Sequence, residues 1–80
     1  MLSIKSITYF ARHLLRDFKG SLAHYEYNAY EFSEYEGEKF LEWSFGRSAD
    51  DIRMSVDITL PDDWCKEDEA RFARIVMALA

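Results

Sequence analysis

The sequence predicts an α+β fold in the order α-β-β-β-α, with the three strands in an antiparallel meander and the two helices on one of its faces. Three observations lead to this fold class. Apolar residues recur at helical spacing near both ends of the chain, three alternating runs lie between them, and turn residues separate the runs. Because 80 residues form only one modest core, we expect a single domain spanning residues 1–80.

The first element is expected to be an amphipathic helix over about residues 4–19. Ser3 is a suitable N-cap, and Gly20 is expected just beyond the last turn. The apolar stripe of this helix consists of Ile4, Ile7, Phe10, Ala11, Leu14, Leu15 and Phe18. The opposite face carries Lys5, Tyr9, Arg12, Arg16 and Lys19. That face is predicted to be basic and exposed to solvent.

The first strand is predicted over about residues 22–33. Apolar or aromatic side chains alternate here with polar ones, as a half-buried strand requires. The apolar or aromatic residues are Ala23, Tyr25, Tyr27 and Ala29. Tyr30 and Phe32 then fall on the other parity. A β-bulge near Asn28 would re-aim these later side chains, and a broken strand is the alternative explanation.

Two further strands are predicted over about residues 38–47 and 52–60. Gly37 separates the first two strand-like runs, which predicts a hairpin loop with this glycine at positive φ. The apolar positions of the second strand are Leu41, Trp43 and Phe45. In the third strand, the apolar positions expected on one face are Ile52, Met54, Val56, Ile58 and Leu60. This regular alternation makes the third strand the clearest element of the chain.

The last element is predicted to be a helix over about residues 63–79. Pro61 ends the preceding strand, and Asp62 and Asp63 are expected to cap the helix. Its apolar stripe consists of Phe72, Ile75, Val76 and Leu79.

Composition and charge narrow the class of protein. Hydrophobic residues make up 49% of the chain, so it has enough apolar surface to fold. No apolar run is long enough to span a membrane, and Cys65 is the only cysteine, which together favour a cytoplasmic protein without internal disulfides. Residues 1–20 hold four basic and one acidic side chain, whereas residues 21–80 hold six basic and fourteen acidic ones. The expected partner therefore has a basic surface, and direct nucleic-acid binding is not expected.

The sequence carries no pattern typical of a catalytic or metal site. Cys65 and His24 lack the local motif of a nucleophilic pair. His24 and Glu26 would face the same side of a strand, but two ligands do not close a zinc site. We therefore expect a protein that is not an enzyme, with no catalytic residues, no metal and no cofactor.

Acidic and aromatic residues gather around the predicted first hairpin. Tyrosine is enriched at protein interfaces, and residues two apart on an extended chain are separated by about 6.5 to 7 Å, comparable with successive phosphates of a nucleic-acid strand. Glu34, Glu36 and Glu38 are thus expected to imitate DNA toward a basic groove. The predicted partner-binding residues are Tyr30, Glu31, Glu34, Tyr35, Glu36, Glu38, Glu42, Asp50 and Asp51.

The order α-β-β-β-α resembles the double-stranded-RNA-binding domain over the whole chain, at the level of topology. That family grips phosphates through a basic start to its second helix. The matching stretch here is acidic and contains Asp62, Asp63, Lys66, Glu67, Asp68 and Glu69. Phosphate binding through that surface would be repulsive, so the resemblance carries over no functional residue.

In size, acidity and α+β order, the chain is also similar to the small phage-encoded anti-CRISPR proteins. The residues that suggest the similarity are Glu34, Glu36, Glu38, Asp50 and Asp51, with Tyr30 and Tyr35 beside them. The resemblance implies a stoichiometric inhibitor that occupies a basic DNA-binding channel of a nuclease effector complex in the cytoplasm of a bacterial host.

Two other hypotheses remain open. The chain also fits an immunity or antitoxin-type protein, or a small subunit, that packs on one cognate protein through an aromatic surface, as a monomer or a homodimer. The basic helix face, with Lys5, Arg12, Arg16 and Lys19, is a further candidate for contact with nucleic acid or an acidic partner.

Overall fold

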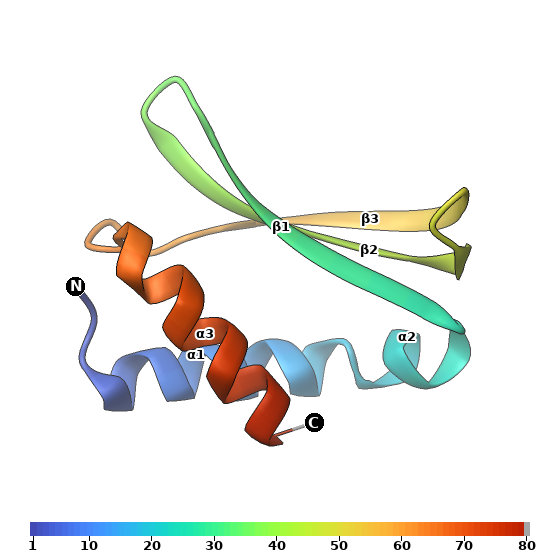
Figure 1. Ribbon diagram of the computed structural model, residues 1–80, viewed down its shortest axis with the longest axis horizontal. Helices are drawn as coiled ribbons and strands as arrows, with labels where there is room; N and C mark the ends of the chain where they lie inside the picture. The colour runs from blue at the N-terminus through green and yellow to red at the C-terminus, as the bar shows by residue number, and fades with distance from the viewer. Residues whose placement is uncertain (80) are drawn as a thin grey trace. The chain divides into compact units, whose positions relative to one another are not determined.

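The computed structural model describes residues 1–79 and confirms the α+β fold (Figure 1). Three antiparallel strands form an open sheet in the order β1-β2-β3, which confirms the predicted meander. The elements are α1 (Ile4–Asp17), α2 (Lys19–His24), β1 (Tyr27–Tyr35), β2 (Glu38–Ser48), β3 (Asp51–Thr59) and α3 (Lys66–Leu79). The contacts divide the chain into a helical unit, made of residues 1–19 and 63–79, and a sheet unit, made of residues 20–62.

Within the helical unit, α1 packs against α3 through its apolar stripe. Ile7 and Ala11 on α1 and Phe72 on α3 are completely buried. The Phe10 ring contacts the rings of Trp64 and Phe72, with centroids 5.8 and 5.9 Å apart. Close packing of this kind fixes the two helices to each other, because such aromatic pairs add to the burial of apolar area.

The first helix is shorter than the sequence predicts. Ser3 is the N-cap as expected, and its hydroxyl oxygen accepts a hydrogen bond from the Ser6 amide. The helix ends at Asp17, however, and Phe18 separates it from α2. Gly20 therefore lies inside a second helix rather than beyond the first, and the strand predicted from residue 22 is wrong in its first residues. The segment 19–24 contains no β-branched residue, which lowers the cost of helix formation there.

The first strand pairs with β2 without interruption from Tyr27 to Tyr35. Of the two explanations for the change of parity, the β-bulge near Asn28 is absent. The parity changes because the predicted strand is broken: residues up to His24 belong to α2, and β1 begins only at Tyr27. Leu41, Trp43 and Phe45 are buried, as predicted for one face of β2.

The β1–β2 turn has two residues in the left-handed region, Glu36 with φ 51° and Gly37 with φ 81°. The positive φ predicted for Gly37 is confirmed. Two successive residues with positive φ are typical of a two-residue type I′ hairpin, whose twist matches that of the strands.

The regular pairing of β2 with β3 breaks near their shared turn. Toward the turn, three successive pairs of residues lie opposite each other: Phe45 and Met54, then Gly46 and Ile52, then Ser48 and Asp51. Each step skips one residue, which is the mark of a β-bulge. As a result, Ile52 is 42% exposed, and its predicted place beside Met54 on the apolar face is wrong.

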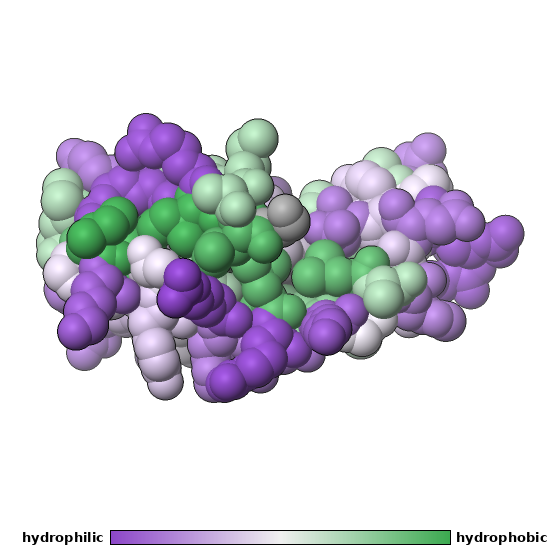
Figure 2. Space-filling model, turned by 90° about the horizontal axis from the view of Figure 1, so that it is seen from below, coloured by the Kyte–Doolittle hydropathy of each residue, from purple (hydrophilic) through white to green (hydrophobic). Residues whose placement is uncertain are grey.

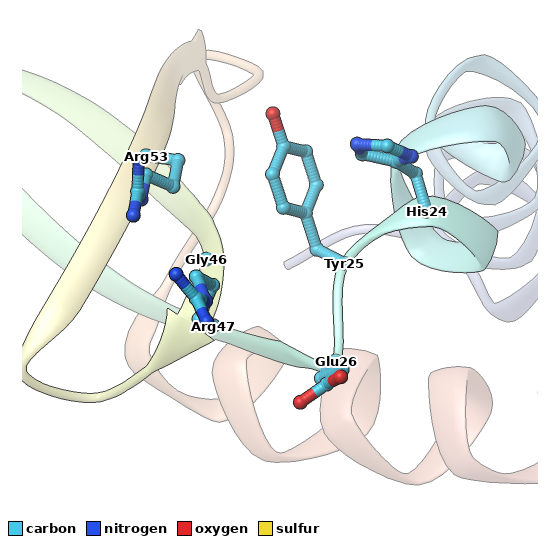
Figure 3. A pocket seen from close by; sticks show the side chains of 6 residues that line it. All are labelled: His24, Tyr25, Glu26, Gly46, Arg47 and Arg53. Carbon is cyan, nitrogen blue, oxygen red and sulfur yellow. The ribbon is translucent and has the colours of Figure 1, made fainter.

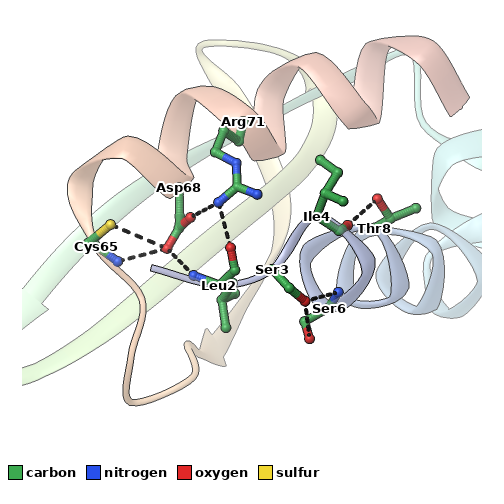
Figure 4. A network of polar contacts seen from close by, with 8 residues as sticks. All are labelled: Leu2, Ser3, Ile4, Ser6, Thr8, Cys65, Asp68 and Arg71. Atoms are coloured by element: carbon green, nitrogen blue, oxygen red, sulfur yellow. Dashed lines mark hydrogen bonds and ion pairs between the residues drawn. The ribbon is translucent and has the colours of Figure 1, made fainter.

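The last helix begins at Lys66, three residues later than predicted, so Asp62 and Asp63 do not cap it. The carboxylate of Asp68 instead accepts a hydrogen bond from the backbone amide of Cys65, at 3.0 Å, as in a capping box (Figure 4). The sequence signal for this cap is the spacing of three residues between Cys65 and Asp68.

Asp68 is completely buried and lies at the centre of a polar network. Its Oδ2 atom also accepts from the Leu2 amide at 3.3 Å, and its Oδ1 atom accepts from Arg71 Nη1 at 2.7 Å. The same Arg71 nitrogen donates to the Leu2 carbonyl oxygen (Figure 4). Burial alone would raise the pKa of Asp68, but hydrogen bonds from Cys65, Leu2 and Arg71 outweigh it and hold this pKa below its usual value.

Candidate binding surfaces

A row of three carboxylates crosses one face of the sheet. Glu31 on β1 lies directly opposite Glu42 on β2, and Glu42 lies directly opposite Asp57 on β3. All three have the parity opposite to that of the buried Trp43 and Phe45, so they share the outward face of the sheet. We call these three residues the carboxylate row.

A shallow pocket of about 230 Å³ lies beside the carboxylate row. Ala29 and Ser44 contribute small side chains to this hollow, and Glu31 and Glu42 also line it. Its lining consists of Tyr27, Ala29, Tyr30, Glu31, Glu42, Ser44, Ala49 and Ile52. The β2–β3 bulge contributes to this surface, because it places Ile52 among outward-facing residues. The hollow thus combines apolar walls with negative charge.

No lysine or arginine forms an ion pair with the carboxylate row within residues 1–79. Side chains directly opposite each other on neighbouring strands have Cβ atoms about 4.5 to 5.5 Å apart, and like charges at this distance are destabilising. The isolated protein therefore tolerates an unfavourable arrangement, which a cationic partner would relieve.

Replacing Glu42, the middle member of the row, by Gln is expected to stabilise the isolated protein by about 0.5 kcal/mol, because it removes two like-charge contacts. Urea denaturation at low ionic strength measures the change. Glu34→Gln is the control, since Glu34 lies opposite Lys39 and loses a favourable contact when it is neutralised. Equal stabilisation by both variants would mean that net charge, and not the row, sets the effect.

The acidic residues of the first hairpin do not form the extended series that the sequence predicts. Glu36 lies in the turn, so the chain reverses between Glu34 and Glu38. Glu34 shares the inward parity of Trp43, whereas Glu38 has the outward parity of Glu42. The predicted spacing for imitating phosphates along one strand is therefore wrong for these three residues.

Asp50 and Asp51 lie at the β2–β3 turn, at the opposite end of β2 from the first hairpin turn. Asp51 is also held by a basic neighbour: its Oδ1 atom is 2.8 Å from Arg53 Nε, and its Oδ2 atom accepts from Arg53 Nη2 at 3.1 Å. The nine predicted partner-binding residues thus occupy separate parts of the sheet. Only Glu31 and Glu42 belong to the carboxylate row, which Asp57 completes.

The two candidate tyrosines differ in their surroundings. The Tyr30 ring packs 4.9 Å from the Trp43 ring, is half-buried, and burial raises the pKa of its phenol. Tyr35 is 69% exposed beside the hairpin turn. Tyr35 is therefore available to a partner, whereas much of Tyr30 serves the packing of the sheet.

The helical unit offers two further surfaces. The basic side chains predicted for the first helix are exposed, although Lys19 lies in α2. Beside them, the Nδ1 atom of His13 accepts from Arg16 at 3.1 Å, and its Nε2 atom lies 3.4 Å from Asp17 Oδ2. Figure 2 shows apolar side chains gathered over α1 and α3. The large exposed apolar residues of this unit include Met1, Ile4, Met77 and Leu79. Ile4 is 63% exposed and so does not join the buried stripe predicted for the helix.

Within residues 1–79, no three His, Cys, Asp or Glu side chains are arranged to hold a metal ion. Across the same residues, every helix is too short or too polar to cross a membrane. Comparisons with protein-family models, with curated proteins and with solved structures returned no match.

Proposed function

We propose that this protein is a non-enzymatic inhibitor that binds a basic surface of another protein through the outward face of its sheet. The observation that carries the proposal is the carboxylate row beside the hollow lined by Ala29 and Ser44. A lysine or arginine of the partner would place its aliphatic stem against the apolar wall and its charge between Glu31 and Glu42.

The chemistry of the row favours a basic partner over other kinds. Three adjacent carboxylates repel one another in the free protein, and binding a cation removes that repulsion as well as forming new ion pairs. Tyr35 is exposed and lies on the same face of the sheet as Glu31. It extends the surface with an aromatic side chain of the kind that is enriched at protein interfaces.

The partner class that we propose is a nucleic-acid-binding protein, with a CRISPR effector complex as the specific candidate. A groove that binds DNA presents closely spaced Lys and Arg side chains, which match a row of carboxylates. Occupation of that groove would block target engagement without any catalytic step. In this proposal, the carboxylate row, and not the series Glu34, Glu36 and Glu38, competes with DNA phosphates for the basic groove.

A tagged pull-down from bacterial lysate, run at about 50 and 500 mM salt, tests this proposal. The variant Glu31→Gln, Glu42→Gln, Asp57→Asn removes the charges of the row. We expect a DNA-binding complex to be recovered by the wild type at low salt, and recovery to fall at least about tenfold in the variant and at high salt.

The matched control is Asp62→Asn, Asp63→Asn, Glu67→Gln, which removes the same charge from exposed positions outside the row and the hollow. It should retain most of the binding. Equal loss in the two triple variants would show that net charge alone drives association. Recovery of one salt-resistant partner by both variants would refute the charge-based proposal.

The exposed apolar surface of the helical unit favours a second candidate function. Met77 is 79% exposed and Ile4 63% exposed, and contiguous apolar surface of this kind marks protein interfaces. An immunity or antitoxin-type protein, or a small subunit, would bury these residues against one cognate chain. Binding of that type would resist salt and would be lost in Ile4→Ser, Met77→Ser rather than in the row variant.

A further inference from the structure

An open pocket of about 460 Å³ lies at the bulged end of the sheet, within the sheet unit. Its lining consists of His24, Tyr25, Glu26, Gly46, Arg47 and Arg53 (Figure 3). The volume falls within the range of about 300 to 1,000 Å³ that small-molecule sites occupy. None of the predicted partner-binding residues lies in this pocket, whose parts come from three separate segments.

The two arginines of the pocket are the residues that the β2–β3 register skips. On β3, Arg53 lies between the paired residues Met54 and Ile52 and has no partner on β2. On β2, Arg47 lies between the paired residues Gly46 and Ser48 and has no partner on β3. Residues at a bulge leave the regular alternation, and their side chains take new directions. The irregular pairing that exposes Ile52 therefore also brings two guanidinium groups to the same pocket.

Three hydrogen-bond donors of the pocket are unused within residues 1–79. The Tyr25 hydroxyl and the His24 ring nitrogens form no hydrogen bond with the described chain, and the nearest acidic contact of Arg47 is 4.0 Å from its Nε to Asp51 Oδ2. The His24 ring stands edge-on to the Tyr25 ring, with centroids 4.7 Å apart. Figure 3 shows the Tyr25 ring between Arg53 and His24. Arg53 and His24 thus flank the Tyr25 ring from opposite sides.

Two carboxylates lie near this pocket, and neither fills it. Asp51 binds Arg53 through two contacts, of 2.8 and 3.1 Å, and so holds that guanidinium in place. The hydrogen bond and charge of Asp51 raise the pKa of Arg53, which keeps it cationic. Glu26 lines the pocket, but its carboxylate lies on the side away from the Tyr25 hydroxyl (Figure 3). Arg47 has only the longer ion pair with Asp51, at 4.0 Å, because the same carboxylate is held more closely by Arg53.

A tetrahedral oxyanion can use donors from different segments of the chain better than a planar one can. A phosphoryl group presents three terminal oxygens in different directions, and each can accept from a different donor, whereas a carboxylate presents two oxygens in one plane. Arginine forks are well suited to phosphate, and a neighbouring aromatic ring can pack against an organic group.

We propose that this pocket binds a phosphorylated small molecule, with Arg47 and the Tyr25 hydroxyl contacting the phosphoryl oxygens and Arg53 closing one side. The organic part of the ligand packs against the Tyr25 ring. This site is separate in its residues from the carboxylate row and does not depend on the function proposed above.

Titrations followed by two-dimensional amide NMR test this proposal, with phenyl phosphate, inorganic phosphate and benzoate as probes. We expect saturable shifts at Tyr25, Gly46 and Arg47 with phenyl phosphate, weaker binding of inorganic phosphate, and the weakest binding of benzoate, which keeps the ring but lacks the phosphoryl group. Arg47→Gln should weaken phenyl phosphate binding by about tenfold, and Tyr25→Phe by about threefold.

Arg16→Gln is the matched control, because Arg16 lies on α1 near another tyrosine and histidine but is already bonded to His13. It should leave the affinity unchanged. Equal weakening by Arg16→Gln and Arg47→Gln would show diffuse attraction and overturn the proposal, as would tighter binding of benzoate than of phenyl phosphate. The absence of saturable shifts in the wild type up to about 10 mM phenyl phosphate would also overturn it.

Discussion

Replacing Asp68 by Asn is expected to destabilise the protein by about 2 to 4 kcal/mol at neutral pH, because the buried carboxylate accepts hydrogen bonds from both Arg71 and the backbone. An amide has one acceptor oxygen, so some of these donors would lose their partner, and the Arg71 charge would lose its counter-ion. Urea denaturation followed by circular dichroism measures the loss.

The effect should depend on pH in a defined direction. The pKa of Asp68 is depressed in the folded protein below its ordinary value of 3.8. Its contribution to stability is therefore present above pH 3.8 and is lost as the pH falls below this value toward the folded-state pKa. The difference in stability between wild type and Asp68→Asn should be constant from neutral pH to about pH 5 and should narrow in more acidic solution.

Glu69→Gln is the control for this experiment, since Glu69 neighbours Asp68 in the first turn of α3 but its side chain forms no hydrogen bond or ion pair within residues 1–79. It should change stability by less than about 0.5 kcal/mol. If Asp68→Asn were equally mild, the polar network would not stabilise the contact between Leu2 and α3.

Replacing Gly46 by Ala is expected to destabilise the protein by about 2 kcal/mol or more. A Cβ atom at this position would clash with the Asp51 carbonyl oxygen and lie 2.8 Å from Ile52 Cα. Both are backbone atoms, so the clash can be relieved only by moving β3 away from β2 at the bulge. Thermal unfolding measures the loss, and the amide signals of Arg47 and Arg53 should shift because these residues flank the disturbed pairing.

Gly20→Ala provides a control of opposite sign. Gly20 lies inside α2, and a Cβ atom there would meet nothing within 4 Å. Alanine has the higher helix propensity, so this variant should be more stable by about 0.5 to 1 kcal/mol. A mild effect of Gly46→Ala, similar in size to that of Gly20→Ala, would contradict the close approach of the two strands.

Much of the fold could be predicted because its signals are local. The hairpin at Gly37 follows from a glycine between two strand runs, and the N-cap at Ser3 follows from one hydroxyl before an apolar stripe. The segment 19–24 was predicted incorrectly, because its period-two pattern continues into β1 while its residues also suit a short helix. Such ambiguity is inherent in short segments, where propensity and pattern can disagree.

The candidate sites were less predictable. The sequence placed Glu31 and Glu42 among the partner-binding residues, but it did not place Asp57 with them. Their alignment depends on the register of two strand pairs, which brings together residues as far apart in the chain as Glu31 and Asp57. No local pattern specifies that register. The grouping of Glu34 with Glu36 and Glu38 failed for the same reason, since the turn reverses the chain between them.

The sequence by itself determined the α+β class, the meander, the basic face of α1 and the acidic character of the sheet, because periodicity and charge are properties of neighbouring residues. Only the tertiary structure decided which charges meet. The two skipped residues in the β2–β3 register expose Ile52 and bring Arg47 and Arg53 to one pocket. A bulge depends on how two strands pair, and pairing depends on interactions between segments that are separate in the chain.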